Sequence, residues 1–406
     1  MALTEKPRRA EQTSRLPVTV ILLGLTSFFT DVGTEMIFPL LPVFLTETLR
    51  AGPAYLGLVE GAADTVSSLT KLVSGALADV LPRRKPLVLF GYALASAARP
   101  FVALAMRPWH VLAVRVTDRI GKGVRSSPRD ALIADAAGER VGRAFGFHQA
   151  MDNAGAVVGP LLATGLIALQ LSIRSVFWVA VIPGAIATAL VALVREPARN
   201  AHKVERTEAA LAGMGAWLGD RRMLLYLGIL ALFSLGNSSD AFLLLRASSL
   251  GLRTAEVPIL WSALNLSKVL WAYFGGDLAD RFPRARLIAV GWLVYALVYV
   301  GLGSATKAWH AWVLFGAYGI FYGLTEPVEK ALVKDLARKD LRGRAYGAYN
   351  FVIGVTALPA GLLTGMLWRI FGPTIALRAA AALAGVASVL LLIWASWASR
   401  FPRSSD

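Results

Sequence analysis

The sequence contains no cysteine, and it has few residues of the types that build soluble catalytic sites. Without cysteine the chain has no disulfide, no thiolate metal site and no thiol nucleophile. Its four histidines have no paired spacing and it has only seven methionines, so a soft-metal site is not indicated. Walker, HExxH and serine-elbow sequences are also missing, and with them the residues of ATP-driven pumping and conventional hydrolysis. We therefore expect no enzyme activity, no cofactor and no metal centre.

Charged residues are also scarce, at 17% of the 406 residues, whereas 56% are hydrophobic. The mean hydropathy of +0.57 is far above that of a soluble protein of this size, which indicates an integral membrane protein. The net charge of +16 is concentrated in short segments between apolar runs. This distribution is typical of cytoplasmic loops. We expect a multi-pass protein of the bacterial cytoplasmic (inner) membrane, in contact with the lipid bilayer and without a nucleic-acid partner.

Apolar runs of about twenty residues, separated by short polar loops, predict an all-α membrane protein with twelve transmembrane helices. The loops after the even-numbered runs carry most of the arginines and lysines, so both termini are predicted to be cytoplasmic. The predicted spans are 17–45, 54–80, 86–106, 109–134, 145–170, 174–194, 223–249, 255–279, 286–305, 309–334, 345–370 and 373–397.

Four short sequences of the first half recur in the same order about two hundred residues later, which indicates an internal duplication. The pairs are GALAD (75–79) with GDLAD (276–280), WH (109–110) with WH (309–310), ALIAD (131–135) with ALVKD (331–335), and GRAFG (142–146) with GRAYG (343–347). The predicted units are a cytoplasmic tail over 1–16, six-helix bundles over 17–194 and 223–397, a cytoplasmic linker over 195–222, and a tail over 398–406.

The fourth predicted span carries a stripe of charged residues on an otherwise apolar helix. At 100° per residue its six charged positions fall within roughly 120° of one another. A single charge at mid-bilayer costs roughly 3 kcal/mol even on lenient scales, so the stripe must face water, a substrate path or fixed counter-charges. The six positions are Arg115, Asp118, Arg119, Lys122, Arg125 and Arg129.

Two carboxyl groups, Asp31 and Glu35, share a face of the first predicted span because they are four residues apart. A carboxyl group buried in a membrane protein can exchange protons near neutral pH. We therefore predict that this pair couples transport to protons. The alternative is that both carboxylates form fixed salt bridges with arginines of the fourth span and only hold the helices in register.

Other polar residues within apolar spans are candidates for a substrate cavity. Two of them, Lys71 and Lys268, come from corresponding regions of the two halves and could bind an anion together. Equally, each could neutralise a nearby carboxylate, and hard cations also remain open as substrates. The candidates are Glu60, Asp64, Lys71, Arg115, Lys122, Asn237, Asp240, Lys268, Tyr322, Glu326 and Glu329.

The loops GALADVLPRRKPL (75–87) and GDLADRFPRARL (276–287) resemble the cytoplasmic loop signature of the major facilitator superfamily. The sequences FTDVGTEMIFPLLPVFL (29–45) and DRIGKGVRSSPRDALIAD (118–135) are similar to one bacterial and archaeal branch of it. The resemblance implies two pseudo-symmetric six-helix bundles with a substrate site between them near mid-membrane. It also implies alternating access and a monomeric unit.

The same resemblance implies roles for individual residues. Arg119, followed by Gly123, resembles a fourth-span feature of the superfamily that helps a neighbouring acid change protonation, and Arg115 is a competing choice for this role. Asp118 joins Arg119 in the predicted proton-coupling set. In the two loops, acids and arginines would form a network that closes the cytoplasmic side. These gate residues are Asp79, Arg83, Arg84, Asp280, Arg281 and Arg284.

The sequence GAVVGPLLATG (155–165) is similar to a superfamily motif associated with antiporters. We therefore expect a secondary active transporter that exports a small molecule in exchange for protons. The alternative is proton- or exchange-coupled transport of an organic or inorganic anion, with Lys71, Lys268, Arg115 and Arg119 as its binding residues.

Overall fold

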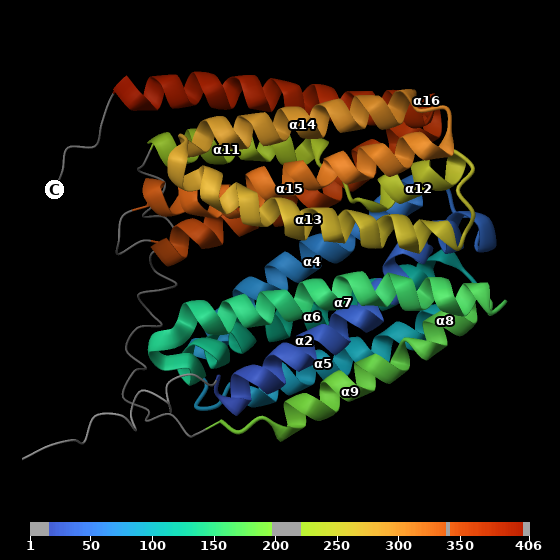
Figure 1. Cartoon of the computed structure of the whole chain (residues 1–406), viewed down its shortest axis with the longest axis vertical. Coiled ribbons are helices and arrows are strands. Elements are labelled where there is room, and N and C mark those ends of the chain that lie inside the picture. The colour runs from blue at the N-terminus through green and yellow to red at the C-terminus, as the bar shows by residue number, and fades with distance from the viewer. Residues whose placement is uncertain (1–15, 197–220, 338–341, 401–406) are drawn as a thin grey trace, which may run out of the picture.

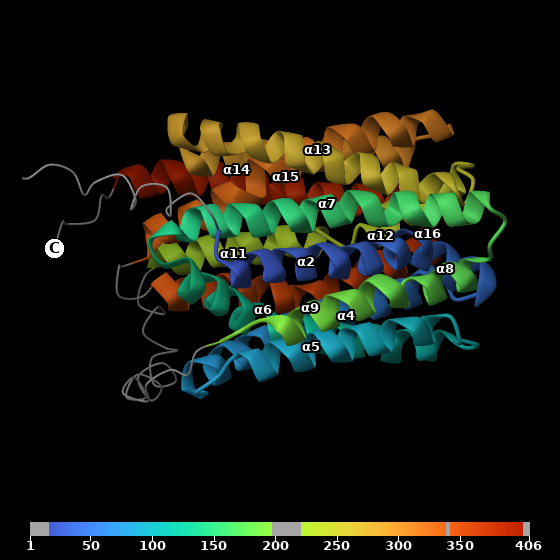
Figure 2. The same ribbon diagram turned by 60° about the horizontal axis from the view of Figure 1, so that its bottom comes forward.

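The computed structural model describes residues 16–196, 221–337 and 342–400, and within these ranges all regular structure is helical. The helices run side by side along one direction (Figures 1 and 2). The predicted tails over 1–16 and 398–406 and the predicted linker over 195–222 lie almost entirely outside the described residues.

The first half of the chain forms one layer of helices, drawn from blue to green in Figure 1. Proline occupies the first turn of its longer helices α4 and α6, where the backbone N–H has no partner to lose. Its elements are α2 (Val18–Ile37), η1 (Phe38–Leu40), α3 (Leu41–Val43), η2 (Phe44–Thr48), α4 (Pro53–Val80), α5 (Lys85–Ala98), η3 (Arg99–Val102), α6 (Pro108–Ala137), η4 (Gly138–Arg140), α7 (Val141–Ala168), α8 (Ile173–Val179) and α9 (Val181–Leu193).

The second half forms the opposing layer, drawn from yellow-green to red. Its last element bends at Gly372, whose φ of 84° is a left-handed conformation that glycine adopts without strain. This bend falls between the predicted eleventh and twelfth spans. The elements are α11 (Arg221–Gly236), α12 (Ala241–Ser249), α13 (Glu256–Arg281), α14 (Arg284–Ser304), α15 (Ala308–Leu336) and α16 (Arg342–Arg400).

The two halves share one packing pattern. In the first half α2 packs on α7 and α9, while α4 and α5 pack on α6 and α5 also contacts α9. In the second half α11 packs on the long α16, while α13 and α14 pack on α15 and α14 also contacts α16. Equivalent helices therefore meet in both halves, as the internal duplication predicts.

Six helical segments of the described residues are long and apolar enough to cross a membrane. Helices α4, α6, α13 and α15 are not among them, although they are long, because many of their positions are charged or polar. The number of twelve spans therefore stays a prediction. The six segments are Val18–Thr48, Val141–Ala168, Ile173–Leu193, Arg221–Ser249, Arg284–Ser304 and Ala345–Ala398.

The two halves contact each other through α4 on α16 and through α7 on α13. Glycines allow the backbones of α4 and α16 to touch: a Cβ atom added at Gly57 would lie 2.0 Å from the carbonyl oxygen of Gly361. Farther along, the Thr65 hydroxyl donates to the carbonyl of Gly354 at 2.7 Å. Ser262 of α13 donates to Val157 of α7 at 2.9 Å.

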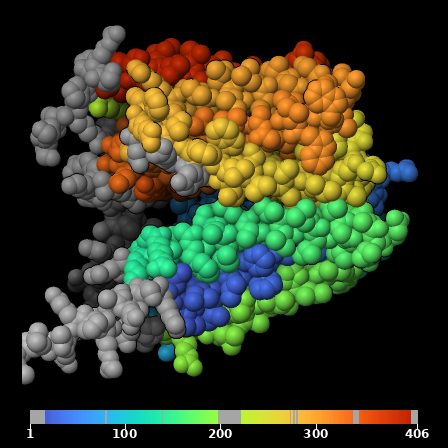
Figure 3. All heavy atoms as spheres, viewed as in Figure 1, coloured from blue at the N-terminus to red at the C-terminus, as the bar shows by residue number. Residues whose placement is uncertain are grey.

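These contacts lie toward one end of the molecule, where α4 and α13 begin. Toward the opposite end, where α2 begins and α16 ends, the gap between the halves widens (Figure 3). The halves are thus joined at one end and spread at the other.

Candidate functional site

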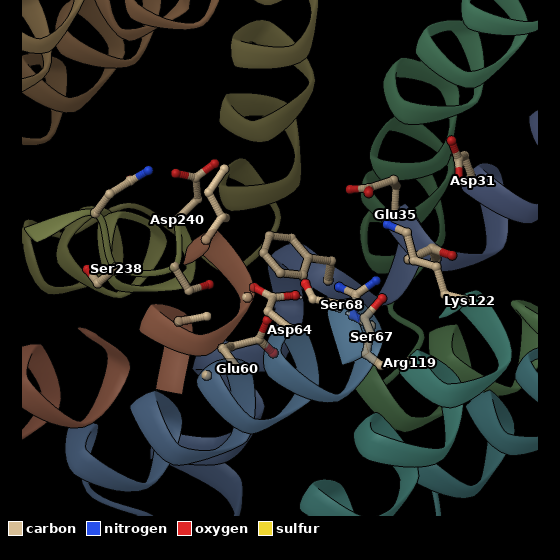
Figure 4. A pocket seen from close by; sticks show the side chains of 18 of the residues that line it. Asp31, Glu35, Glu60, Asp64, Ser67, Ser68, Arg119, Lys122, Ser238 and Asp240 are labelled. Atoms are coloured by element: carbon tan, nitrogen blue, oxygen red, sulfur yellow. Dashed lines mark ion pairs between the residues drawn. The ribbon is translucent and has the colours of Figure 1, made fainter. Parts of the chain in front are cut away.

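A cavity of about 490 Å³ lies between the two halves. The first half contributes residues of α2, η1, α4, η3 and α6, and the second half contributes α11, α13, α15, α16 and the segment that joins α11 to α12. Figure 4 shows Asp31, Glu35 and Lys122 on one side, with Asp240 across the cavity. The predicted site residues that line it are Asp31, Glu35, Glu60, Asp64, Arg119, Lys122, Asn237, Asp240, Lys268 and Tyr322.

Two breaks in helical geometry shape the cavity. The first is at η1, where Pro39 cannot supply a helical hydrogen bond. The second separates α11 from α12, so that residues 237–240 line the cavity outside any helix. Residues 237–240 are polar, but the sequence analysis predicts one continuous span over 223–249 and no end of the helix at these residues.

Asp31 and Glu35 differ from the other carboxyl groups of the cavity in having no ion pair among the described residues. Glu35 Oε2 accepts a hydrogen bond from Trp261 Nε1 at 2.6 Å. Since Glu35 is on α2 and Trp261 is on α13, this bond joins the two halves across the cavity. Sequence reasoning did not identify Trp261 as the partner, because it comes from the other half of the chain.

The outer part of the charged stripe on α6 is neutralised by fixed partners. Arg115 binds both carboxylate oxygens of Glu60 at 2.8–2.9 Å, and both side chains are buried. Asp118 accepts a hydrogen bond from Arg99 Nε at 2.8 Å. Arg115 and Asp118 therefore lie behind the cavity wall, where they hold α4, η3 and α6 together. The pairing of Asp118 with Arg99 was not predicted.

The middle of the stripe faces the cavity. Arg119 Nε lies 3.8 Å from Asp64 Oδ1, and Lys122 also lines the cavity. Arg125 is buried with its guanidinium over the ring of Tyr92, 4.3 Å from the centroid. Two of its nitrogens, Nε and Nη1, have no hydrogen-bond partner among the described residues.

On the opposite wall a single carboxylate is held by neutral donors and one lysine. Asp240 accepts hydrogen bonds from Tyr318 at 3.0 Å and from Tyr322 at 2.7 Å. Lys268 Nζ lies 3.4 Å from Asp240 and 3.7 Å from the centroid of the Tyr322 ring, a cation–π contact. Lys268 was predicted either to bind an anion together with Lys71 or to neutralise a nearby carboxylate. In this structure it neutralises Asp240.

Three further predicted cavity residues lie outside the lining. Lys71 is exposed on α4, and Glu326 forms an exposed ion pair with Lys330 at 3.2 Å. Glu329 is buried two turns beyond Tyr322, where α14 and α16 cover it. There it accepts hydrogen bonds from Trp292 at 3.1 Å and from Tyr349 at 2.7 Å.

The predicted gate contains two ion pairs that occupy equivalent places in the two halves. Arg84 Nη1 lies 2.6 Å from Asp135 Oδ2 at the end of α6, and Arg284 pairs with Asp335 at the end of α15. The two aspartates end the repeated ALIAD and ALVKD sequences, which was the available signal for them. The side chains of the predicted partners Asp79 and Asp280 lie outside the described part of the structure, and Arg83 and Arg281 are exposed.

Within the described residues, no three histidine, aspartate or glutamate side chains group as ligands of a metal ion. Carboxylates and basic side chains line the cavity in nearly equal number. Such a site can bind a charged or polar small molecule.

The sequence model of the Major Facilitator Superfamily matches residues 23–358 of the chain. An uncharacterized MFS-type transporter of Methanocaldococcus jannaschii is 30% identical over 389 residues, 94% of this chain and 96% of the relative. The multidrug resistance protein MdtH of Photorhabdus laumondii is 29% identical over 324 residues, 78% of each chain.

Solved structures with the same fold include the nucleoside transporter NupG, with a TM-score of 0.76 and 12% identity over 93% of this chain and 98% of that one. A POT family transporter in complex with 5-aminolevulinic acid has a TM-score of 0.76 and 12% identity over 94% and 96% of the two chains. The fold is thus that of these transporters, with two helical halves around a central cavity. The chain is a membrane transporter and not an enzyme, and it belongs to the major facilitator superfamily.

Proposed function

We propose that this protein is a proton-coupled secondary transporter that exports a small molecule from the cytoplasm by alternating access. The observation that supports the proposal is that Asp31 and Glu35 line the cavity without an ion pair among the described residues. Among the described residues, the other three acids that line the cavity each face a basic partner. Glu60 faces Arg115, Asp64 faces Arg119, and Asp240 faces Lys268. Asp31 and Glu35 line the cavity without an ion pair, so they can gain or lose a proton without stranding a buried cation.

The hydrogen bond from Trp261 to Glu35 offers a way to couple a proton to the conformation. A hydrogen bond to an ionised carboxylate is roughly twice as strong as one between neutral groups. Deprotonated Glu35 therefore holds α13 of the second half more tightly than protonated Glu35 does. Protonation would favour separation of the halves at this level, as a switch between states requires.

Charges from three helices face these two carboxyl groups and would bias their protonation. Helix α6 supplies basic side chains to both, α7 supplies an acid to Asp31, and α13 supplies a lysine to Glu35. These neighbours are Arg119, Lys122, Arg125, Asp152 and Lys268.

The direction of transport follows from two further considerations. The described halves are joined at the end where α4 begins and are spread at the opposite end, where α2 begins and α16 ends. With both termini cytoplasmic, this conformation accepts its substrate from the cytoplasm. The similarity to MdtH proteins, which are named for multidrug resistance, supports export of a foreign small molecule.

Anion transport is the second candidate, and Arg125 is the observation that favours it. Its unpartnered nitrogens beside Lys122 could receive a carboxylate or a phosphate. Arg119 also lines the cavity, 3.8 Å from Asp64, and could bind the anion with it. The other three residues first considered for this role support it less. Arg115 is saturated by Glu60, Lys268 is paired with Asp240, and Lys71 is outside the cavity.

The test is proton flux in proteoliposomes loaded with a proton-sensitive dye and screened with cations, anions and neutral drugs. We expect one class of compound to drive proton movement in the wild type, and Asp31→Asn or Glu35→Gln to abolish the movement. Glu326→Gln is the matched control, since this glutamate is exposed and outside the cavity. Transport with unchanged pH dependence in both cavity variants would contradict the proposal, and uptake of an anion together with protons would establish the second candidate.

A further inference from the structure

A second cavity, of about 550 Å³, lies away from the central site, between α11 and the last part of α16. Its lining is apolar except for one arginine. Residues three or four apart recur on each helix, so each set forms one face and the groove runs along both helices. The lining consists of Arg221, Leu224, Leu225, Gly228, Ile229 and Leu232 of α11 and Leu390, Ile393, Trp394 and Trp397 of α16.

The dimensions of this groove match one leaflet of a bilayer. From Arg221 to Leu232 it extends about 16 Å at 1.5 Å per residue, which is about half of the 30 Å hydrocarbon core. Gly228 leaves space in the groove, since a Cβ atom there would meet no atom within 4 Å. Ile393 beside it is 58% exposed, so a hydrocarbon chain could contact it.

One end of the groove is positively charged and has the character of a membrane interface. Arg221 is the first residue of α11, and its guanidinium lies 5.8 Å from the centroid of the Trp397 ring. Trp394 Nε1 donates to the backbone carbonyl of Arg222 at 3.2 Å. Tryptophans with a polar edge at helix ends are typical of the membrane–water interface. The groove thus combines a basic interfacial end with an apolar body.

We propose that this groove binds an anionic phospholipid, with one acyl chain along α11 and α16 and the phosphate on Arg221. The planar guanidinium matches the oxygens of a phosphate group, and basic pockets between membrane helices bind anionic headgroups. The groove lies outside the central cavity, so this inference depends neither on the substrate nor on proton coupling.

The test is native mass spectrometry of the full-length protein after titration with phosphatidylglycerol or phosphatidylcholine in detergent. We expect the wild type to retain one phosphatidylglycerol about tenfold more tightly than phosphatidylcholine. Gly228→Leu fills the groove and should remove this lipid. Arg221→Gln should reduce the preference for phosphatidylglycerol, and Arg221→Lys should keep part of it because the charge remains.

Two matched controls separate the groove from general effects. Gly385→Leu places the same side chain at another open position of α16, where no atom lies within 4 Å. Arg107→Gln removes an exposed arginine at the opposite end of the molecule. Both should bind lipid as the wild type does. Equal retention by Gly228→Leu and Gly385→Leu, or an unchanged preference in Arg221→Gln, would overturn the proposal. The proposal would also be overturned if the wild type formed a dimer without bound lipid and Gly228→Leu removed that dimer.

Discussion

Helices α6 and α15 occupy equivalent places in the two halves, but the buried carboxylates around them are bound by different kinds of side chain. Positions 200 residues apart correspond, so Arg115 of α6 matches Phe315 of α15 and Lys122 matches Tyr322. The first half neutralises its buried carboxylates mainly with guanidinium groups, as for Glu60 and Asp118. The second half holds Glu329 with neutral hydroxyl and indole donors alone, and it holds Asp240 with two tyrosine hydroxyls and one lysine. A duplicated scaffold has kept its helix packing while its charge chemistry diverged.

This difference predicts that the two halves tolerate loss of a buried carboxylate unequally. Glu60→Gln removes the nearer counter-charge of buried Arg115 and leaves only Asp118, 4.0 Å away. Breaking a buried pair in this way costs about 3–5 kcal/mol. Glu329→Gln keeps an acceptor for neutral donors and strands no cation, so we expect it to cost about 1 kcal/mol. Thermal unfolding in detergent measures both variants. Equal losses of stability would remove the contrast between the halves.

The contact between the halves should be sensitive to any added side chain. Gly57→Val cannot fit against the carbonyl of Gly361, so it should weaken the joined end. A shift of about 1.4 kcal/mol between conformational states changes their ratio tenfold, and we expect transport to fall by about this factor or more. Vesicle assays give the rate, and Gly385→Val is the control at an open position. A rate as high as that of the control would show that the joined end does not limit transport.

The hydrogen bond from Tyr322 to Asp240 predicts a moderate loss of stability when it is removed. Tyr322→Phe removes one hydrogen bond to the Asp240 carboxylate, and a bond to a charged group contributes about 1.5–3 kcal/mol. Tyr226→Phe is the control, since the buried Tyr226 hydroxyl has no hydrogen-bond partner among the described residues. Thermal unfolding should separate the two variants. If both melt at the same temperature, Tyr322 does not support Asp240.

We expect the smallest losses of stability at the two ion pairs of the predicted gate, which occupy equivalent places in the two halves. Asp135→Asn and Asp335→Asn each remove an ion pair whose carboxylate is more than half exposed. Such pairs contribute about 1 kcal/mol or less. We therefore expect similar, small changes in melting temperature for both variants. A large change in only one would show that the gate is as asymmetric as the cavity.

Most of the fold could be predicted from the sequence because its signals are repeated and long. Apolar runs placed the helices, and the repeated ALIAD and ALVKD sequences revealed the duplication. The charged stripe on α6 was also visible, since helical periodicity alone brings its residues to one face. Long-range partners were not visible. The contact of Glu35 with Trp261 joins residues 226 positions apart, and no local pattern encodes such a pair.

The site was predicted in part for a related reason. Periodicity gives the face of a helix but not what covers it, so Glu329 could not be separated from the cavity residues before its contacts with Trp292 and Tyr349 were known. Likewise Arg115 resembled an anion-binding residue until Glu60 was placed against it. The break at residues 237–240 lacked a proline signal and was missed.

The most direct test of the account is a pair of distances measured by spin-label spectroscopy across the two ends of the protein. One label pair, at Met106 and Thr306, reports the joined end, and a second, at Arg143 and Lys334, reports the spread end; all four positions are exposed. Glu35→Gln mimics the protonated carboxyl group and weakens the bond to Trp261. We predict that it lengthens the first distance and shortens the second. Distances that stay as in the wild type, or that change in the same direction, would contradict proton-coupled alternating access through Glu35.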